Sequence, residues 1–165
     1  VPDPDFAANW TIYLSYAESA VDETNGTAVA RARLDGMRLT DVTVILRQQP
    51  KIASGHHFGS RLVFARDGRL FTTLGERNKE RDSAQDLGTH IGKIVRIGKD
   101  GTVPADNPFV GQSGGDAGDL GYVAHEPVQQ VDVVDRLVHV GAAAVEGPGA
   151  APRAAVIVRL RGDTA

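Results

Sequence analysis

The strongest constraint on the fold of this chain is a repeated pattern, in which apolar and polar residues alternate in short runs that end at Asp-Gly pairs. The pairs are Asp35-Gly36, Asp67-Gly68 and Asp100-Gly101, at nearly equal spacing. Alternation with a period of two predicts half-buried strands, and glycine turns between such runs predict hairpins. An Asp-Gly pair between two strands favours a type I′ turn, in which both central residues have positive φ. We therefore predict an all-β chain of antiparallel strands.

The alternating runs predict six strands and very little helix. They place strands over residues 10–16, 27–34, 37–46, 61–66, 69–74 and 92–98. A single helical turn is expected over Ser83 to Leu87, with Ser83 as its cap and Gly88 as its stop. Short strands with regular turns are typical of sandwiches, barrels and propeller blades.

Composition excludes several classes of protein. The chain has 165 residues, no cysteine and a formal net charge of −3, so disulfides, thiolate chemistry and cysteine-bound zinc are excluded. The near balance of charges gives no basic footprint for nucleic acid, which we do not expect as a partner. No apolar run approaches the ~20 residues of a membrane span. The opening Val-Pro-Asp-Pro-Asp does not read as a signal peptide.

The last third of the chain differs from the rest. Of nine aromatic residues, only Tyr122 lies beyond Phe109, and all four lysines precede residue 110. Ala, Gly and Val supply 30 of the 56 residues from Val110 onward. Because aromatic side chains dominate core energetics, we expect the first two thirds to hold the folded core.

The most unusual local cluster is the Ser-Gly-His-His-Phe-Gly-Ser-Arg sequence of residues 54–61, which precedes a predicted strand. Glycine lets a backbone approach a ligand closely, and loops at strand ends often carry function. His56 or His57 could act there as a general base, because the pKa of histidine lies near neutrality. A turn with a solvent-facing histidine pair explains the same residues.

Two further clusters follow predicted strands. In residues 74–82, Glu76 could accept hydrogen bonds from substrate hydroxyls, although a charge run of this kind is more often a solvated loop. In residues 85–92, local capping explains Gln85, Asp86, His90 and Gly92 as well as ligand binding does.

Two other chemistries have weaker support. A serine hydrolase built on His57 and Ser60 lacks the G-x-S-x-G pattern of a nucleophile elbow. A zinc site made of His56, His57 and His90 lacks any recognised ligand spacing.

Five motifs, in order and at matching spacing, resemble the soluble glucose/sorbosone dehydrogenase family. They are PDFAANWTIYLSY, GTAVARARLDG, GHHFGSRLVFARDGRLFTTLGER, AQDLGTHIGKIVRIGKDG and VPADNPF, all within residues 1–109. This family consists of quinoproteins, among them aldose sugar dehydrogenases, that use pyrroloquinoline quinone (PQQ). The resemblance implies a six-bladed β-propeller of several hundred residues with PQQ in a cleft over its top face. The chain then corresponds to a fragment of about two blades, with residues 1–109 as a partial propeller domain and residues 110–165 as a tail.

The resemblance also implies roles for two residues. His57 matches the histidine of the family's H-x-x-x-R-L element, the base that takes the proton of the sugar's C1 hydroxyl while hydride passes to the quinone. Glu76 matches the acidic residue after a strand end that lines the sugar pocket. His56 matches no residue with a role.

The tail departs from the family pattern. The family's GHRN-x-QG element, which touches the cofactor, and its HE-x-GP-x-GGDE element, near the calcium that bridges PQQ, are both missing, and His125-Glu126-Pro127 is only an echo of the second. Asp116 and Asp119 lack the 12-residue EF-hand pattern and fit a loop better than a calcium site. Two hypotheses remain: a divergent blade with strands in VVDRLVHV and AAVIVRLRG, or a sequence read in a shifted frame.

The expected function is therefore that of a fragment of a quinoprotein sugar dehydrogenase. The parent protein would oxidise an aldose or polyol, with PQQ as hydride acceptor, calcium as electrophile and an external electron acceptor, in the periplasm or outside the cell. The fragment alone is expected to be inactive. The alternative is a non-catalytic propeller-type binding module or an inactive truncated product.

Overall fold

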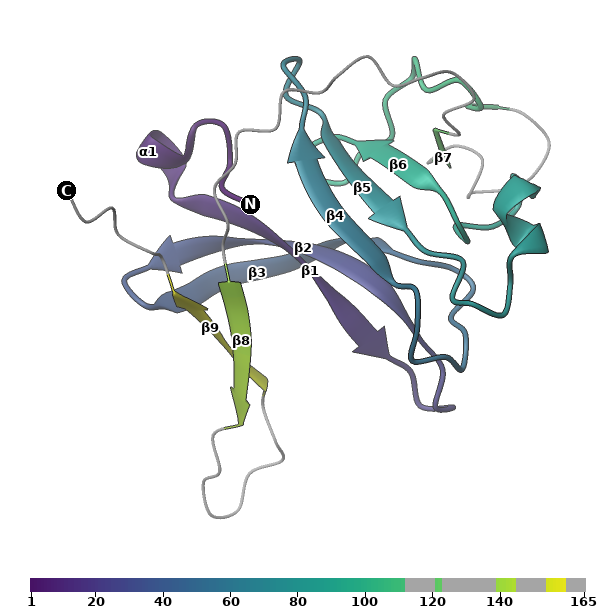
Figure 1. The fold of residues 1–165 in the computed structure, drawn as a ribbon. Coiled ribbons are helices and arrows are strands. Elements are labelled where there is room, and N and C mark those ends of the chain that lie inside the picture. The colour runs from purple at the N-terminus through teal and green to yellow at the C-terminus, as the bar shows by residue number, and fades with distance from the viewer. Residues whose placement is uncertain (112–120, 123–138, 145–153, 160–165) are drawn as a thin grey trace.

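A computed structural model describes residues 1–111, 121–122, 139–144 and 154–159 of the chain. Its strands form three antiparallel sheets (Figure 1). The first sheet contains β1 (Thr11–Ser19), β2 (Asn25–Asp35) and β3 (Arg38–Arg47), and the second contains β4 (Gly59–Phe64), β5 (Leu70–Leu74), β6 (Ile94–Ile97) and β7 (Gly121–Tyr122). The third sheet pairs β8 (His139–Ala144) with β9 (Ala154–Arg159).

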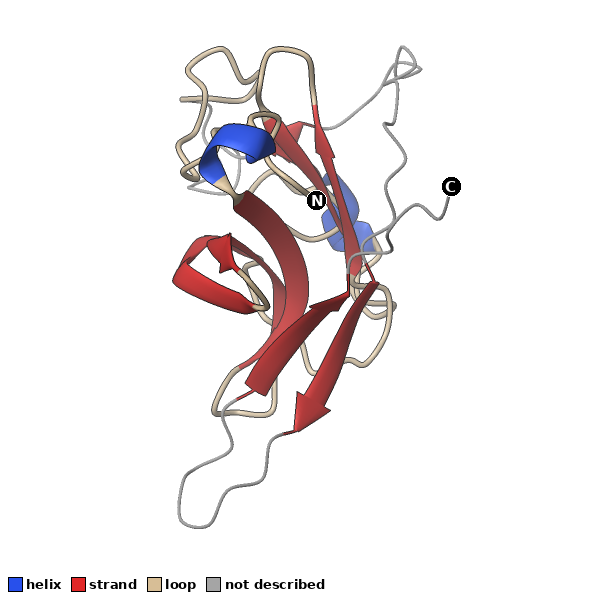
Figure 2. Cartoon of the chain, turned by 90° about the vertical axis from the view of Figure 1, so that its left-hand side faces the viewer, coloured by secondary structure: helices blue, strands red, loops and turns tan. Residues whose placement is uncertain are grey.

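The all-β prediction is confirmed, and strands β1 to β6 overlap the six predicted runs. The helical turn expected at Ser83 is a single 3-10 turn, η1 (Asp82–Gln85), so its start is one residue early. Helix α1 (Phe6–Asn9) was not predicted, because its four residues carry no helical periodicity. Helices are minor beside the strands, as Figure 2 shows.

The first hairpin turn differs from the prediction. Asp35 pairs with Arg38 as the last pair of β2 and β3, so Gly36 and Met37 form the two-residue loop. Of these two, Gly36 alone has positive φ, at 59°. A type I′ turn centred on Asp35-Gly36 is therefore wrong. Glycine at the first central position, followed by a residue with negative φ, is the pattern of a type II′ turn.

The other two Asp-Gly pairs share one turn geometry, which is also not a type I′ turn centred on the pair, because Asp67 and Asp100 do not have positive φ. Gly68 and Gly101 both have positive φ, of 78° and 91°. In each turn the aspartate accepts a backbone hydrogen bond from two residues on: Asp67 Oδ1 from Arg69 N at 3.0 Å, and Asp100 Oδ1 from Thr102 N at 3.1 Å. The first of these turns joins β4 to β5, whereas the second follows β6 and leads into a loop.

The hydrophobic core lies where the first two sheets meet, with β1 packed against β4. Its buried members come from both sheets: Tyr13, Val29 and Leu46 from the first, and Leu62, Leu70, Leu74, Val95 and Ile97 from the second. The rings of Tyr13 and Phe64 meet edge to face with centroids 5.0 Å apart. Two half-buried sheets thus cover each other and hold the loops at their ends in a fixed relation.

The tail adds strands at three described places. The pair Gly121–Tyr122 extends the second sheet by pairing with β6. Strand β9 lies within the AAVIVRLRG sequence, and β8 begins near the end of VVDRLVHV, as the divergent-blade hypothesis predicts strands there. The remainder of both sequences lies outside the described residues. In the part of the chain that the structure describes, no helix is long and apolar enough to cross a membrane.

Candidate active site

The candidate site forms where two segments meet at one end of the second sheet. His57 lies two residues before β4, and Glu76 lies two residues after β5. Because β4 and β5 are antiparallel neighbours, with Gly59 opposite Leu74, the start of one strand and the end of the other fall together. Gly75 N donates to Phe58 O at 3.0 Å, which continues the ladder into the site.

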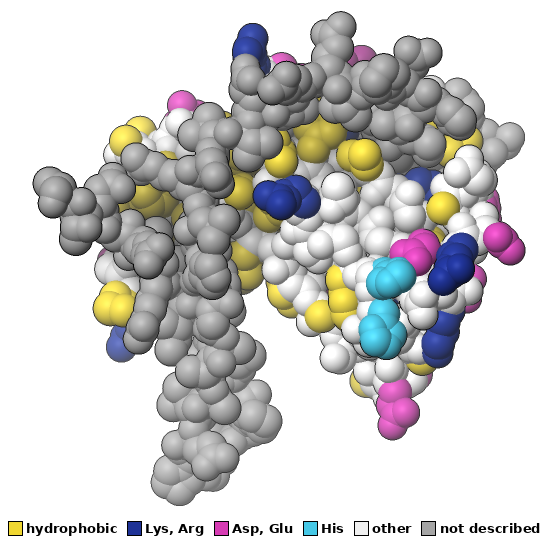
Figure 3. Space-filling view, viewed as in Figure 1, with side chains coloured by type: hydrophobic (Ala, Val, Ile, Leu, Met, Phe, Trp, Pro, Cys, Tyr) yellow, Lys and Arg dark blue, Asp and Glu magenta, His cyan; other side chains and the backbone are white. Residues whose placement is uncertain are grey.

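The side chains of His57 and Glu76 are in direct contact. Nδ1 of His57 lies 2.5 Å from Oε1 of Glu76. The hydrogen bond from His57 lowers the pKa of Glu76 below its usual value. The histidine side chain keeps 51% of its surface exposed and the glutamate 24%. Figure 3 shows two neighbouring histidine side chains on this surface, with an acidic side chain against them.

In this arrangement a carboxylate holds a histidine ring that can act as a base. A carboxylate at Nδ1 fixes the ring orientation and the tautomer, which leaves Nε2 as the proton acceptor. The exposure of the ring gives a substrate access to it. The same carboxylate would stabilise the imidazolium that forms when the ring takes up a proton. One oxygen of Glu76 is sufficient for this contact.

The backbone around the pair is strained. His57, Ser60, Arg77 and Asn78 all have positive φ, between 49° and 80°, although none of them is glycine. Such residues cost about 1–3 kcal/mol each and persist only where the surrounding structure imposes them. They lie on both segments of the site, two on each. This clustering supports a functional rather than a purely connecting role for the two loops.

Thr27 in β2 and Gln48, the residue after β3, support both segments through hydrogen bonds. Thr27 Oγ1 donates to Phe58 O at 2.7 Å, beside His57. The buried Gln48 donates from Nε2 to Gly75 O at 2.9 Å, beside Glu76, and accepts from Thr27 N at 3.0 Å. The site is therefore built on the junction between two sheets, which no single segment of the sequence reveals.

Arg77 is the residue of the site that the sequence analysis missed. It belongs to the charge run 74–82, which was interpreted as a solvated loop. The neighbouring Asn78 and Lys79 are indeed exposed, but Arg77 is fully buried. The guanidinium carbon lies 3.5 Å from the centroid of the Phe58 ring. A charged residue in a polar run carries no sequence signal of burial.

The structure does not assemble the other chemistries. His56 and His57 have ring centroids 6.5 Å apart, but His90 is buried elsewhere, with Nδ1 3.0 Å from Arg47 O. Among the described residues, no three histidine or acidic side chains converge on a possible metal position. Ser60 Oγ lies 3.5 Å from the Thr27 hydroxyl group. Asp116, Asp119 and the His125-Glu126-Pro127 echo lie outside the described residues.

These residues fit one part of a quinoprotein site. The half-exposed His57 held by Glu76 fits the base beside a bound cofactor. The described residues hold no group of three acidic or histidine side chains that could bind calcium.

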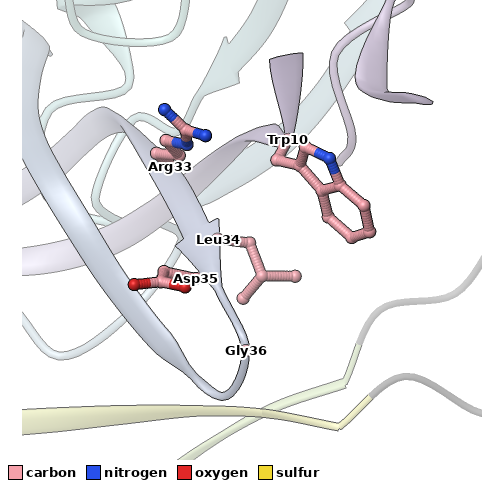
Figure 4. Close-up of a pocket in the computed structure, with 5 residues that line it drawn as sticks. All are labelled: Trp10, Arg33, Leu34, Asp35 and Gly36. Carbon is pink, nitrogen blue, oxygen red and sulfur yellow. The ribbon is translucent and has the colours of Figure 1, made fainter. Parts of the chain in front are cut away.

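A shallow pocket of about 220 Å³ lies at the tip of the first hairpin and does not include His57 or Glu76. It is lined by Trp10, Arg33, Leu34, Asp35 and Gly36 (Figure 4). Leu34 points toward Trp10, whereas Asp35 lies on the other side of the strand. The pocket thus offers an indole, an aliphatic side chain and two charged residues, Arg33 and Asp35.

Comparison with known proteins finds relatives among the sugar dehydrogenases. A model of the family described as Glucose / Sorbosone dehydrogenase matches residues 1–119. The chain is 46% identical over 126 residues to the aldose sugar dehydrogenase YliI of Escherichia coli (strain K12), covering 75% of this chain and 34% of that protein.

Solved structures agree. A crystal structure of a glucose dehydrogenase matches with a TM-score of 0.67 and 49% identity, over 69% of this chain and 33% of that one. The PQQ-bound form of an aldose sugar dehydrogenase from Streptomyces coelicolor matches with a TM-score of 0.57 and 27% identity, over 67% of this chain and 32% of that one. The prediction of an all-β, partial β-propeller is confirmed. The chain spans about a third of the length of these relatives.

Proposed function

This chain belongs to the glucose/sorbosone dehydrogenase family, and we propose that it is part of a longer quinoprotein, called the complete protein below, that oxidises an aldose or a similar polyol. The observation that carries the proposal is the contact between Nδ1 of His57 and Oε1 of Glu76 at one end of the second sheet. It puts an imidazole with a carboxylate partner on an open surface, which supports a role for His57 as a general base.

In the proposed reaction, His57 acts as the base. Nε2 takes the proton from the C1 hydroxyl group of the sugar, and the carboxylate of Glu76 holds the ring and stabilises the imidazolium. PQQ, when bound, would supply the acceptor for the hydride from C1, so that an aldose that loses one proton and one hydride at C1 becomes a lactone. The second oxygen of Glu76 could also accept a hydrogen bond from a sugar hydroxyl group, so that Glu76 would both position His57 and line the sugar pocket.

The remaining parts of the proposal concern the complete protein. Two features support PQQ as its cofactor: the family match and the PQQ-bound relative. Calcium, an external electron acceptor and a periplasmic or secreted location follow from the family resemblance. The described residues hold no cluster of acidic or histidine side chains, so we expect the calcium ligands to come from other parts of the complete protein.

We also propose a division of the chain. Residues 1–109 form the partial propeller domain, and residues 110–165 form a divergent or frameshifted tail. Its described Gly121–Tyr122 strand extends the second sheet. Because the chain spans 34% of its curated relative, we propose that it is inactive by itself.

Reconstitution tests this function. The complete protein, incubated with PQQ and calcium, should reduce a redox dye when an aldose is added, and should fail to do so without PQQ. The 165-residue chain should be inactive under the same conditions. Sugar binding by the complete protein without dye reduction would favour a non-catalytic binding module, and neither binding nor reduction would favour an inactive product.

A further inference from the structure

We propose that Arg77 is a positioning residue that holds the His57–Glu76 pair in its reactive geometry. The inference rests on the proposed function, because it assigns a role within the same site. Arg77 touches neither the imidazole nor the carboxylate through its guanidinium group. Its effect would pass through the two segments that carry them.

The guanidinium of Arg77 reaches residues on three parts of the chain. Nη2 donates to the side-chain oxygen of Asn25 in β2 and to the carbonyl oxygen of Ser54 at the start of the His57 loop. The group also lies 3.5 Å over the ring of Phe58, at the end of that loop. One planar side chain thus fixes both ends of the loop that presents His57 and ties them to the first sheet.

The main chain of Arg77 completes this arrangement. Its N–H donates to the carbonyl oxygen of His57 at 3.4 Å, and its carbonyl oxygen accepts from Ser54 Oγ at 2.7 Å. Since Arg77 directly follows Glu76 and its N–H bonds to the carbonyl oxygen of His57, we expect a displacement of Arg77 to shift both members of the pair. Nδ1 and Oε1 are 2.5 Å apart, so a small shift of either residue would lengthen this hydrogen bond.

The surroundings of the Arg77 guanidinium do not favour a buried charge, so a contribution to the stability of the fold does not explain this residue. It is fully buried, and its Nε and Nη1 atoms have no hydrogen-bond partner among the described residues. Among the described residues, its guanidinium contacts an amide oxygen, a carbonyl oxygen and an aromatic ring, and none of these groups is a carboxylate. Burial lowers the pKa of its guanidinium. A buried cation without a paired carboxylate is unfavourable compared with an apolar side chain, whereas a planar fork can fix orientation in a way that an apolar side chain cannot.

The first test measures geometry without activity. Ring nitrogen and Nδ1–H signals of His57 are recorded by NMR in the 165-residue chain, for the natural sequence and for Arg77→Lys, Arg77→Met and Asn25→Leu. Each variant should weaken the strongly hydrogen-bonded Nδ1–H signal, and Arg77→Lys should retain part of it. The control is Arg81→Met, which removes an exposed arginine bonded to Asn78 at 3.2 Å and should leave the signal unchanged.

The second test measures kinetics in the complete protein. A misplaced base lowers turnover more than binding. Arg77→Lys and Asn25→Leu should therefore reduce kcat by about 10–100-fold. KM should stay within about twofold of that of the natural protein, a change much smaller than the loss in kcat. If Arg77→Met does not fold, these two variants carry the test, because one keeps the cation and the other keeps Arg77 itself. A lower melting temperature with an unchanged His57 signal and unchanged kcat would overturn the proposal. If the natural complete protein oxidises no aldose, the proposed function fails, and the NMR result still decides whether Arg77 positions His57.

Discussion

The backbone of Gly75 runs so close to that of His57 that a Cβ atom on Gly75 would lie 1.7 Å from the His57 carbonyl oxygen. The same atom would lie 3.1 Å from the backbone nitrogen of Gly59. Both segments of the candidate site therefore depend on the absence of a side chain at residue 75. Glycine here permits close packing of two backbones, since its φ is not positive.

Substitution of Gly75 by alanine should separate the two segments. The new methyl group would push the His57 loop away from Glu76, at a cost of about 1–3 kcal/mol in unfolding free energy, and turnover of the complete protein should fall about 100-fold. Denaturant unfolding and steady-state kinetics measure the two effects. Gly55→Ala is the matched control, because a Cβ atom there meets nothing within 4 Å. Equal behaviour of the two variants would contradict the prediction.

Removal of the His57 imidazole should abolish most of the catalysis. In the complete protein, His57→Ala should lower kcat by about 10²–10⁴-fold, the range for loss of a general base. His56→Ala is the control, because the structure shows a ring contact with His57 but no hydrogen bond to Glu76. Unchanged turnover of His57→Ala in a dye-reduction assay would refute the assignment.

The contact between His57 and Glu76 should depend on pH in one direction. The pKa of Glu76 is lowered from 4.5 by the hydrogen bond from His57, so the folded state favours the ionised carboxylate. The contact is complete above pH 4.5 and should be lost as the pH falls through the lowered value. NMR titration of the Glu76 carboxyl carbon checks this sign. In a His57→Ala chain the Glu76 pKa should rise toward 4.5, and an unchanged titration would contradict the assigned cause.

Features that depend on neighbouring residues could be predicted from the sequence, whereas features that depend on contacts between distant residues could not. Strands β1 to β6 could be predicted because alternation is a local pattern. The turn at Gly36 was misplaced by one residue, since register depends on cross-strand pairing and not on the Asp-Gly pair itself. The burial of Arg77 could not be predicted, because its contacts Asn25 and Ser54 lie 52 and 23 residues away.

The candidate site shows the same division. The choice of His57 and Glu76 came from a family resemblance, and their proximity required the antiparallel pairing of β4 and β5. Their contact through Nδ1 and Oε1 could not be read from the sequence, which gives no ring orientation. Their roles remain predictions.

Tyr13 should make the fold sensitive to alkali. Its hydroxyl group shares its one proton between Asp3 Oδ2, at 3.2 Å, and Lys99 O, at 3.1 Å, and the residue is 2% exposed. Burial and the neighbouring Asp3 carboxylate raise its pKa from 10.0 to about 12. A raised pKa gives stability that is complete below pH 10 and is lost as the pH rises to about 12.

That loss amounts to about 3 kcal/mol for two pKa units. Denaturant unfolding of the 165-residue chain between neutral pH and the alkaline range measures it. Tyr13→Phe should be less stable at neutral pH and should lose this part of the alkaline dependence. A variant whose stability follows the same alkaline curve as the natural chain would show that another group is responsible.

The outer strand of the first sheet should make the isolated chain prone to self-association. In the described residues β3 pairs only with β2, and Val42, in the middle of β3, is 58% exposed. Met37, at the adjoining turn, is 79% exposed. An exposed apolar edge strand offers free backbone groups for pairing with a second chain, and a lysine on such an edge opposes that pairing. We therefore expect Val42→Lys to reduce light scattering of the 165-residue chain at a given concentration and to change its melting temperature little. Val103→Lys is the matched control, because Val103 is also exposed, at 39%, but lies in a loop outside the sheets. If both variants suppress scattering equally, added charge explains the effect, and the edge of β3 does not.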